Sequence, residues 1–224
     1  MILAAGRGER MGDLTLSTPK PLLKVAGKYL IEFAIMKAVR AGIHEIVINV
    51  SYQAEQIKAA LGDGQRYGAA IVYSDEPVRL ETGGGVLQAL PLLGDQPFLV
   101  MSSDVVTDYP LTLLPRQLKG LAHLVLVGNP DFYPQGDFGL REGYLDREAK
   151  PAYTYANIGV YHPALFEACE VHCFPLSQVL FPAIKRQLLT GEHYDGVWHN
   201  VGTPSAWMAV NQLLADFPQL VGCD

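Results

Sequence analysis

The alternation of strand-like and helix-like segments in the first half of the chain limits its possible folds most strongly. Runs rich in β-branched or apolar residues predict strands at 45–50, 70–74 and 98–102. Between them, apolar residues at helical spacing predict helices at 30–41, 53–61 and 84–93. Strands and helices in this order usually form a mostly parallel sheet with helices on both faces. The sequence therefore predicts an α/β fold with a mixed, mostly parallel central sheet.

The second half of the chain is less regular. Strands are predicted at 122–127 and 153–161, with an irregular, turn-rich stretch at 129–150 between them. A helix interrupted by Pro182 is predicted over 178–189. Thr203 followed by Pro204 predicts the start of the last helix, because Thr caps helices and Pro fits their first position.

Composition narrows the class of protein. The 224 residues are 49% hydrophobic and carry a formal net charge of −6, which disfavours nucleic acid or an anionic membrane as a partner. No apolar stretch is long enough to span a bilayer, and the start has no basic segment typical of a secretory leader. Three cysteines give no disulfide framework, so we expect a cytoplasmic protein.

The loop from Leu3 to Lys24 has the composition of a phosphate-binding segment. An apolar strand end runs into small residues up to Gly8, which let a backbone approach a ligand closely and expose N–H groups to an anion. Arg10 and Lys20 add positive charge, and the prolines on both sides of Lys20 predict an extended local backbone. Two glycines alone would also suit an ordinary turn.

The spacing matches neither a P-loop nor a dinucleotide fingerprint. The compound pattern L-A-A-G-x-G-x-R-M, a short spacer and P-K-P-L instead resembles the opening of sugar-1-phosphate nucleotidyltransferases. That resemblance implies a Rossmann-like (GT-A-like) nucleotidyltransferase fold in which Arg10 and Lys20 are catalytic and neutralise the nucleotide phosphates. It also implies that the nucleotide is bound by Leu3, Ala4, Ala5, Gly6, Gly8, Arg10 and Lys20.

A second informative stretch is Glu81-Thr82-Gly83-Gly84-Gly85. Three glycines opening a helix permit close approach and place free N–H groups at its positive end, although a flexible turn is the alternative. In the family this position contacts the nucleobase, so the resemblance implies nucleotide contacts from Glu81, Gly84 and Gly85. The run L-E-T-G-G-G resembles the corresponding stretch of the family's uridylyltransferases that act on N-acetylmuramate 1-phosphate. It also resembles that stretch in short mannose-1-phosphate guanylyltransferases.

Asp104 follows the strand predicted at 98–102, so its carboxylate should lie at the ligand edge of the sheet. Asp104 is expected to be catalytic, with Arg10 and Lys20, as the Mg²⁺ ligand, because Mg²⁺ takes one or two carboxylates plus phosphate oxygens. Capping of the next turn is the alternative. The family usually has Gly before this Asp, where this chain has Ser103. The family's second metal ligand is the Asp of Asp-Val-Gly-Thr, replaced here by Asn200, which keeps an oxygen and loses the charge. We therefore expect weakened metal affinity.

The resemblance also implies a sugar-phosphate site formed by Asp137, Lys150, Asn157 and Gly159. Lys150 precedes Pro151 as in many relatives, but Ala149 replaces their glutamate, and a solvated surface lysine remains an equal alternative. Asn157 and Gly159 belong to a strand that lines the sugar pocket in the family. The expected organisation is one domain over 1–224, with a nucleotide-binding half at about 1–108, a sugar-phosphate-binding half at about 109–200 and a C-terminal helix in 201–224.

The predicted activity is Mg²⁺-dependent nucleotidyl transfer from UTP to a sugar 1-phosphate, foremost N-acetylmuramate 1-phosphate, in cell-wall sugar recycling. The expected partners are these two small molecules, and the protein is expected to be a monomer or a small homo-oligomer. One alternative is the same chemistry with mannose-1-phosphate and GTP, glucose-1-phosphate and UTP, or phosphocholine and CTP. The other is a nucleotide-sugar-binding regulatory protein with impaired catalysis, which Asn200 and Ser103 would favour.

Overall fold

The computed structural model describes residues 1–217, which form two compact units. The first unit comprises 1–79, 102–111 and 196–217, and the second comprises 80–101 and 112–195. The predicted C-terminal helix is α5 (Pro204–Asp216), and positions 218–224 of the predicted 201–224 segment lie outside the described residues. The assignment of nucleotide and sugar phosphate to halves divided near residue 108 stays a prediction.

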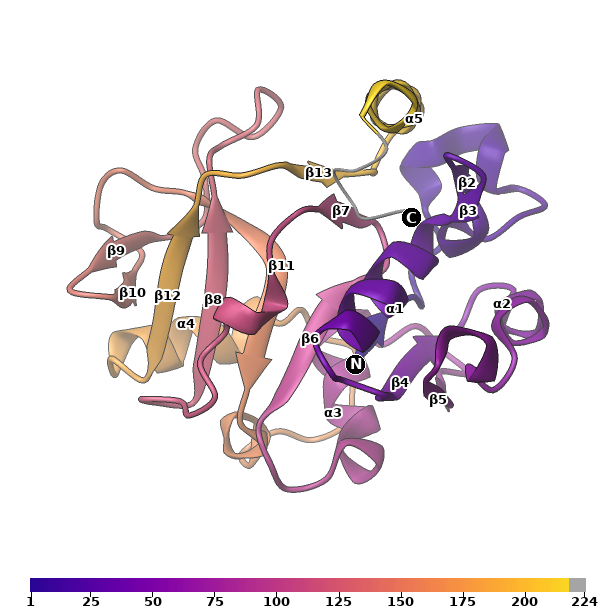
Figure 1. Cartoon of the computed structure of the whole chain (residues 1–224). Coiled ribbons are helices and arrows are strands. Elements are labelled where there is room, and N and C mark those ends of the chain that lie inside the picture. The colour runs from indigo at the N-terminus through magenta and orange to yellow at the C-terminus, as the bar shows by residue number, and fades with distance from the viewer. Residues whose placement is uncertain (218–224) are drawn as a thin grey trace. The chain divides into compact units, whose positions relative to one another are not determined.

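In the first unit, three parallel strands are joined in the order β5 (Ala70–Asp75), β4 (Glu45–Val50), β1 (Ile2–Leu3). The helices α1 (Leu30–Arg40) and α2 (Ala54–Leu61), labelled in Figure 1, belong to the same unit. Two small antiparallel pairs complete it: β2 (Lys24–Val25) with β3 (Lys28–Tyr29), and β7 (Val105–Thr107) with β13 (Trp198–Asn200). Five of the six residues of β4 are buried, as its β-branched sequence predicts.

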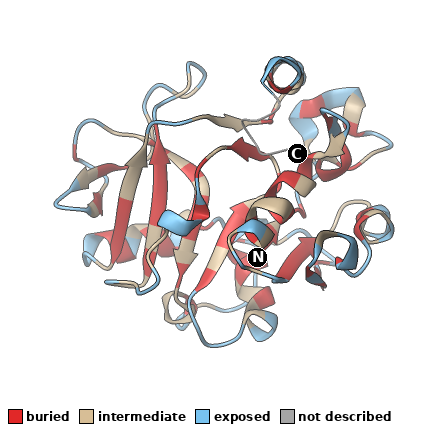
Figure 2. Ribbon diagram, viewed as in Figure 1, coloured by how far each residue is buried: buried red, intermediate tan, exposed pale blue. Residues whose placement is uncertain are grey.

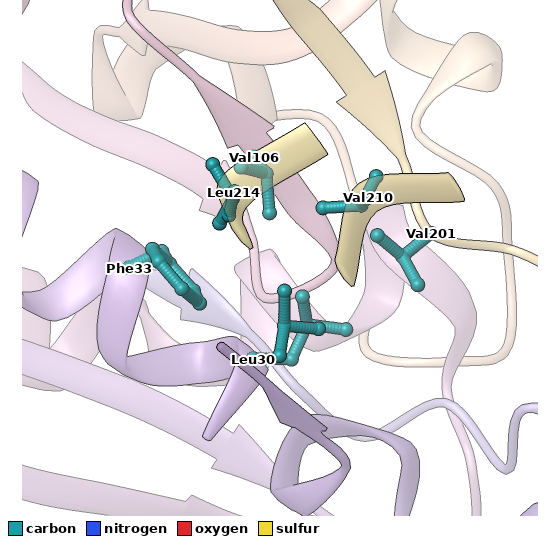
Figure 3. Packing of buried hydrophobic residues seen from close by; sticks show 7 residues of the cluster. Leu30, Phe33, Val106, Val201, Val210 and Leu214 are labelled. Carbon is teal, nitrogen blue, oxygen red and sulfur yellow. The ribbon is translucent and has the colours of Figure 1, made fainter. Parts of the chain in front are cut away.

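A hydrophobic cluster in the first unit holds β7 and β13 in place (Figure 3). In Figure 3, Leu30 and Phe33 of α1 point toward Val106 of β7, Val201 after β13, and side chains of α5. Its buried members are Val25, Leu30, Phe33, Val106, Val201, Val210 and Leu214. Asp104 immediately precedes β7, and Asn200 is the last residue of β13. The packing of this cluster therefore fixes the backbone next to both residues.

In the second unit, six strands are joined in the order β6 (Phe98–Ser102), β11 (Thr154–Tyr161), β8 (Ala122–Val127), β12 (Leu189–Tyr194), β10 (Tyr144–Asp146), β9 (Gly139–Arg141). The β8–β12 pair is parallel, and the other pairs are antiparallel. The helix α4 (Ser177–Lys185) packs against β10, β12 and α3 (Glu81–Leu93). Figure 2 shows β8 as almost entirely buried.

These elements confirm the α/β class with a mixed sheet, and the strands at 45–50, 98–102 and 122–127 have the predicted bounds. Two predictions are wrong. The stretch 129–150 contains the β9–β10 hairpin, which turns at Glu142 and Gly143, both with positive φ. The helix predicted over 178–189 ends at Lys185, because Gln187 adopts a left-handed φ of 55° and Leu189 begins a buried strand. None of the helices in residues 1–217 combines the length and hydropathy that a membrane span requires.

His123 of β8 makes the free energy of unfolding depend on pH. Its Nδ1 lies 2.8 Å from Oγ1 of Thr190, and burial lowers the pKa of His123 from its ordinary 6.5, against the opposing effect of Glu192. The unfolded chain therefore takes up this proton more readily than the folded protein. We expect the free energy of unfolding to fall as the pH decreases through 6.5, the ordinary pKa of histidine. His123→Gln should flatten that decline in urea titrations; an equally steep decline in the variant would assign it to other groups.

Candidate functional site

The loop after β1 contains two glycines with different structural roles. Gly8 has a left-handed φ of 72°, and a Cβ atom there would lie 2.9 Å from Cβ of Lys20. Glycine at position 8 is therefore required by the fold itself. A Cβ atom on Gly6 would meet nothing within 4 Å. No packing within the described chain demands glycine at position 6, which leaves that side of the loop open to a ligand.

This difference predicts opposite behaviour of two alanine variants. Gly6→Ala should keep the melting temperature within about 2 °C of the parent protein, because its methyl group meets no other atom of the described chain. If the loop binds the nucleotide as predicted, the same methyl group should weaken nucleotide binding about tenfold or more. Gly8→Ala should lower the free energy of unfolding by about 1 kcal/mol or more through its strained φ and the Lys20 contact. Thermal unfolding and calorimetric titration with UTP measure both effects. Equal stability losses in the two variants would contradict this assignment.

Lys20 and Asp104 form an ion pair between Nζ and the carboxylate. Their side chains are 12% and 20% exposed. Lys20 begins a 3₁₀ helix (Lys20–Leu22) in which the Leu22 N–H donates to the Pro19 carbonyl oxygen at 2.8 Å. The extended backbone predicted around Lys20 is therefore wrong beyond Pro19, because this turn satisfies its own hydrogen bonds. The pair brings the predicted phosphate-binding cation to the predicted metal ligand, 84 residues along the chain.

Asn200 lies beside the backbone of Asp104, and Arg10 lies beside Gly202, two residues after Asn200. Asn200 is opposite Val105 in the β7–β13 pair, and the Val201 N–H donates to the Asp104 carbonyl oxygen at 2.8 Å. A Cβ atom at Gly202 would lie 3.1 Å from Nη2 of Arg10 and 3.6 Å from Oδ1 of Asn200. The guanidinium thus lies over the bare Cα of Gly202. The first unit therefore brings Arg10, Lys20, Asp104 and Asn200 together.

The oxygens of Asp104 and Asn200 fit a hard divalent cation. Oδ1 of Asn200 is buried and, among the described residues, accepts no hydrogen bond. An unsatisfied buried oxygen is costly unless a ligand pairs with it. Residues 1–217 contain no cluster of three or more His, Cys, Asp or Glu side chains that could hold a metal ion. A cation here would need phosphate oxygens to complete its coordination, as Mg²⁺ commonly does at nucleotide sites.

The second unit carries the Glu81–Gly85 stretch as the first turn of α3, three residues earlier than predicted. Glu81 is exposed and has a left-handed φ of 58°, which is unusual for a residue with a side chain. The N–H groups of Gly83 and Gly84 both donate to the Phe174 carbonyl oxygen, at 2.9 and 3.1 Å. The prediction that these N–H groups are free is therefore wrong: the glycines admit a chain segment from 90 residues away. Contacts of Glu81, Gly84 and Gly85 with a nucleobase stay predictions.

The residues predicted to bind the sugar phosphate also lie in the second unit. The Asp137 carboxylate accepts hydrogen bonds from the Tyr133 hydroxyl at 3.0 Å and the Tyr155 N–H at 2.8 Å. Asn157 has a left-handed φ of 57° at an irregularity of β11, two residues from Tyr155. Asp137 thus helps to hold the strand that presents Asn157.

Gly159 and Lys150 have different environments. A Cβ atom on Gly159 would lie 2.7 Å from Cδ2 of Leu124, so this glycine permits close packing of β11 on β8. Lys150 is exposed in the loop before β11, and its sugar-phosphate contact stays a prediction.

Two groups in the first unit were not predicted from the sequence. The Asn49 side chain accepts a hydrogen bond from the Ala4 N–H and donates one to Glu76. The Arg7 guanidinium lies 5.5 Å from the ring centre of Tyr52, whose hydroxyl lies within hydrogen-bond distance of the Thr15 carbonyl oxygen. Asn49 could have been noticed in the sequence, because it is a polar residue near the end of an otherwise apolar strand. The contact of Arg7 with Tyr52 could not, because the two residues are far apart in the sequence.

The sequence pattern of the nucleotidyl transferase family matches residues 1–216. The chain is 45% identical over 218 residues to the N-acetylmuramate alpha-1-phosphate uridylyltransferase of Neisseria meningitidis serogroup B, covering 91% of this chain and 92% of that protein. It is 29% identical over 222 residues to a mannose-1-phosphate guanylyltransferase catalytic subunit beta from Drosophila pseudoobscura pseudoobscura. That match covers 93% of this chain and 60% of the longer insect protein.

The fold also matches solved structures. A Bacillus anthracis protein assigned as a glucose-1-phosphate thymidylyltransferase superposes with a TM-score of 0.84 and 21% identity, over 96% of this chain and 94% of that one. This likeness confirms the predicted Rossmann-like nucleotidyltransferase fold.

Proposed function

The chain belongs to the nucleotidyl transferase family, and from this membership we propose that it transfers a uridylyl group from UTP to N-acetylmuramate 1-phosphate. The products would be the UDP-sugar and pyrophosphate. The observation that supports this proposal most is the convergence of Arg10, Lys20, Asp104 and Asn200 next to the glycine loop. The choice of substrates rests on the Neisseria relative, which is 45% identical along 91% of this chain.

The proposed reaction is an in-line displacement. A phosphate oxygen of the sugar 1-phosphate attacks the α-phosphorus of UTP, the bond from that phosphorus to the bridging oxygen breaks, and pyrophosphate leaves. Arg10 and Lys20 hold the triphosphate and neutralise its charge, which is the main requirement of such transfers. No general base is needed because the attacking phosphate is already ionised.

We further propose that Asp104 and Asn200 hold Mg²⁺. Bound there, the cation would supply charge neutralisation between the phosphates. Asp104 contributes the negative charge, and Asn200 contributes an oxygen that is buried and without a hydrogen-bond partner among the described residues.

The remaining predicted residues keep their proposed roles. Glu81, Gly84 and Gly85 would contact the nucleobase. Asp137, Lys150, Asn157 and Gly159 would form the sugar-phosphate site. We propose a cytoplasmic enzyme that acts on these small molecules in cell-wall sugar recycling, as a monomer or a small homo-oligomer.

The test is pyrophosphate release with Mg²⁺, crossing UTP, GTP, CTP and dTTP against the 1-phosphates of N-acetylmuramate, N-acetylglucosamine, glucose and mannose, with phosphocholine and CTP added. We expect the highest kcat/KM for UTP with N-acetylmuramate 1-phosphate. A higher value for another pair would replace the substrates and keep the chemistry. Nucleotide binding without pyrophosphate from any pair would favour the regulatory alternative.

A further inference from the structure

One peptide group joins the glycine loop to the loop that carries Asp104. The Leu3 carbonyl oxygen accepts a hydrogen bond from the Ser103 N–H at 3.0 Å. The N–H of the same peptide, that of Ala4, donates to Oδ1 of Asn49 at 2.9 Å. A shift of this one peptide would move both loops relative to β4.

Where the backbone hydrogen bonds between β1 and β4 end, the Asn49 side chain supplies the next hydrogen-bond acceptor. β1 has only two residues, and its last pairing with β4 is Leu3 opposite Asn49. The next N–H, on Ala4, is buried and needs an acceptor, because an unpaired buried donor is costly. Oδ1 of Asn49 supplies that acceptor from a side chain that is part of a buried strand, so the chain leaves β1 in a fixed direction.

Glu76 fixes the Asn49 amide in turn. Nδ2 of Asn49 donates to Oε1 of Glu76 at 2.7 Å, and both residues are only 3% exposed. The Glu76 backbone is tied to β4, since its N–H donates to the Val50 carbonyl oxygen at 2.8 Å and its own carbonyl accepts from the Ser51 hydroxyl at 2.9 Å. This arrangement leaves Oδ1 of Asn49 facing the loop.

We propose that Asn49, oriented by Glu76, is a positioning residue that sets the Leu3–Ala4 peptide and with it the distance between the nucleotide loop and the Asp104 loop. The inference rests on the proposed function, because it assigns these loops to nucleotide and metal. Asn49 itself touches no reacting atom. Its effect comes from geometry, and displacement of a reacting group by about 1 Å can cost about 100-fold in rate.

The test exchanges the amide of Asn49 and the carboxylate of Glu76 between the two positions. Asn49→Asp keeps an acceptor for Ala4 but removes the N–H that binds Glu76. Two buried carboxylates then face each other and either repel or share one proton, so the side chain is no longer held as the amide was. Combined with Glu76→Gln, the aspartate again accepts from Ala4 and from the new amide, so the hydrogen bonds return with the net charge unchanged. We expect Asn49→Asp to lower UTP affinity and kcat/KM at least about tenfold, and the double variant to recover to within about threefold of the parent protein.

Amide hydrogen exchange at Ala4 is the readout that does not depend on turnover. Exchange should accelerate at least about tenfold in Asn49→Asp and return to the parent rate in the double variant. Tyr73→Phe removes a hydrogen bond of the same unit, from the Tyr73 hydroxyl to the Gly62 carbonyl oxygen, and should leave Ala4 exchange and UTP affinity at parent values. If Asn49→Asp does not fold, Asn49→Ala with the same measurements takes its place.

Unchanged Ala4 exchange and UTP affinity in a folded Asn49 variant would overturn the inference, as would altered exchange with unaltered UTP affinity and kcat/KM. A parent protein that neither binds UTP nor turns over would instead sink the proposed function. Ala4 exchange would still decide whether Asn49 sets the loop.

Discussion

Lys20→Met is expected to lower kcat/KM for nucleotidyl transfer by about 100- to 1,000-fold while the protein stays folded. Methionine keeps the chain length that packs beside Gly8 and removes the charge that meets Asp104. A large loss is expected because, in the proposed mechanism, the ammonium would neutralise charge on the reacting phosphates. The melting temperature should fall, since the side chains of the Lys20–Asp104 pair are only 12% and 20% exposed and the variant leaves the Asp104 carboxylate without its partner. Circular dichroism at the assay temperature checks that the variant is folded.

Lys24→Met is the matched control. Lys24 is exposed on β2, and its ammonium lies 5.9 Å from the ring centre of Tyr29. This variant removes an equal charge from the same unit and should retain kcat/KM within about twofold. Steady-state kinetics of both variants measure kcat/KM, and thermal unfolding measures their stability. Retention of more than about a tenth of kcat/KM in Lys20→Met would remove that residue from the phosphate site.

Asp104→Asn is expected to abolish metal-dependent turnover, with a loss of about 1,000-fold or more. The variant leaves two amide oxygens and no carboxylate at the pair of Asp104 and Asn200, and a divalent cation is held poorly without a protein charge. Mn²⁺ titration followed by electron paramagnetic resonance, in the presence of UTP, should show correspondingly weaker binding. Asp95→Asn, in an exposed turn of the second unit, removes the same charge and should change neither quantity.

A second variant, Asn200→Asp, tests the proposed metal site in the opposite direction, by adding a carboxylate. Asn200→Asp restores the carboxylate usual in the family and should lower the Mg²⁺ concentration needed for half-maximal rate by about tenfold. If Asp104→Asn binds Mn²⁺ and turns over as the parent protein does, the cation is held elsewhere. An unchanged Mg²⁺ requirement in Asn200→Asp would remove position 200 alone from the site.

Local patterns in the sequence were enough for the elements that place the site. The strand at 45–50 is a β-branched run with a buried face on both sides, so its bounds could be read directly. Asp104 could be placed because an apolar strand precedes it. Thr203 could be predicted as a helix cap because Pro204 follows it, and in the structure its hydroxyl accepts from the Ala206 N–H at 3.2 Å. Each of these signals lies within a few residues of the feature it predicts.

Features that depend on distant partners could not be read in this way. The β9–β10 hairpin consists of three-residue strands whose stability comes from pairing with β12, about 45 residues later. Gly83 and Gly84 have the composition of an anion-binding turn, and only the Phe174 carbonyl shows why their N–H groups are occupied. The Asn49–Glu76 hydrogen bond spans 27 residues and joins β4 to the residue that follows the parallel strand β5, which no local pattern encodes.

The proposed activity is the transfer of a nucleotidyl group to a sugar phosphate by direct displacement. Its most direct test is a ³¹P NMR time course of the purified protein with UTP, N-acetylmuramate 1-phosphate and Mg²⁺. We predict that UDP-sugar and pyrophosphate appear in equal amounts, and that a chelator stops both together. Hydrolysis of UTP to UMP without a UDP-sugar, or an unchanged spectrum with every sugar 1-phosphate while UTP binds, would contradict the claim.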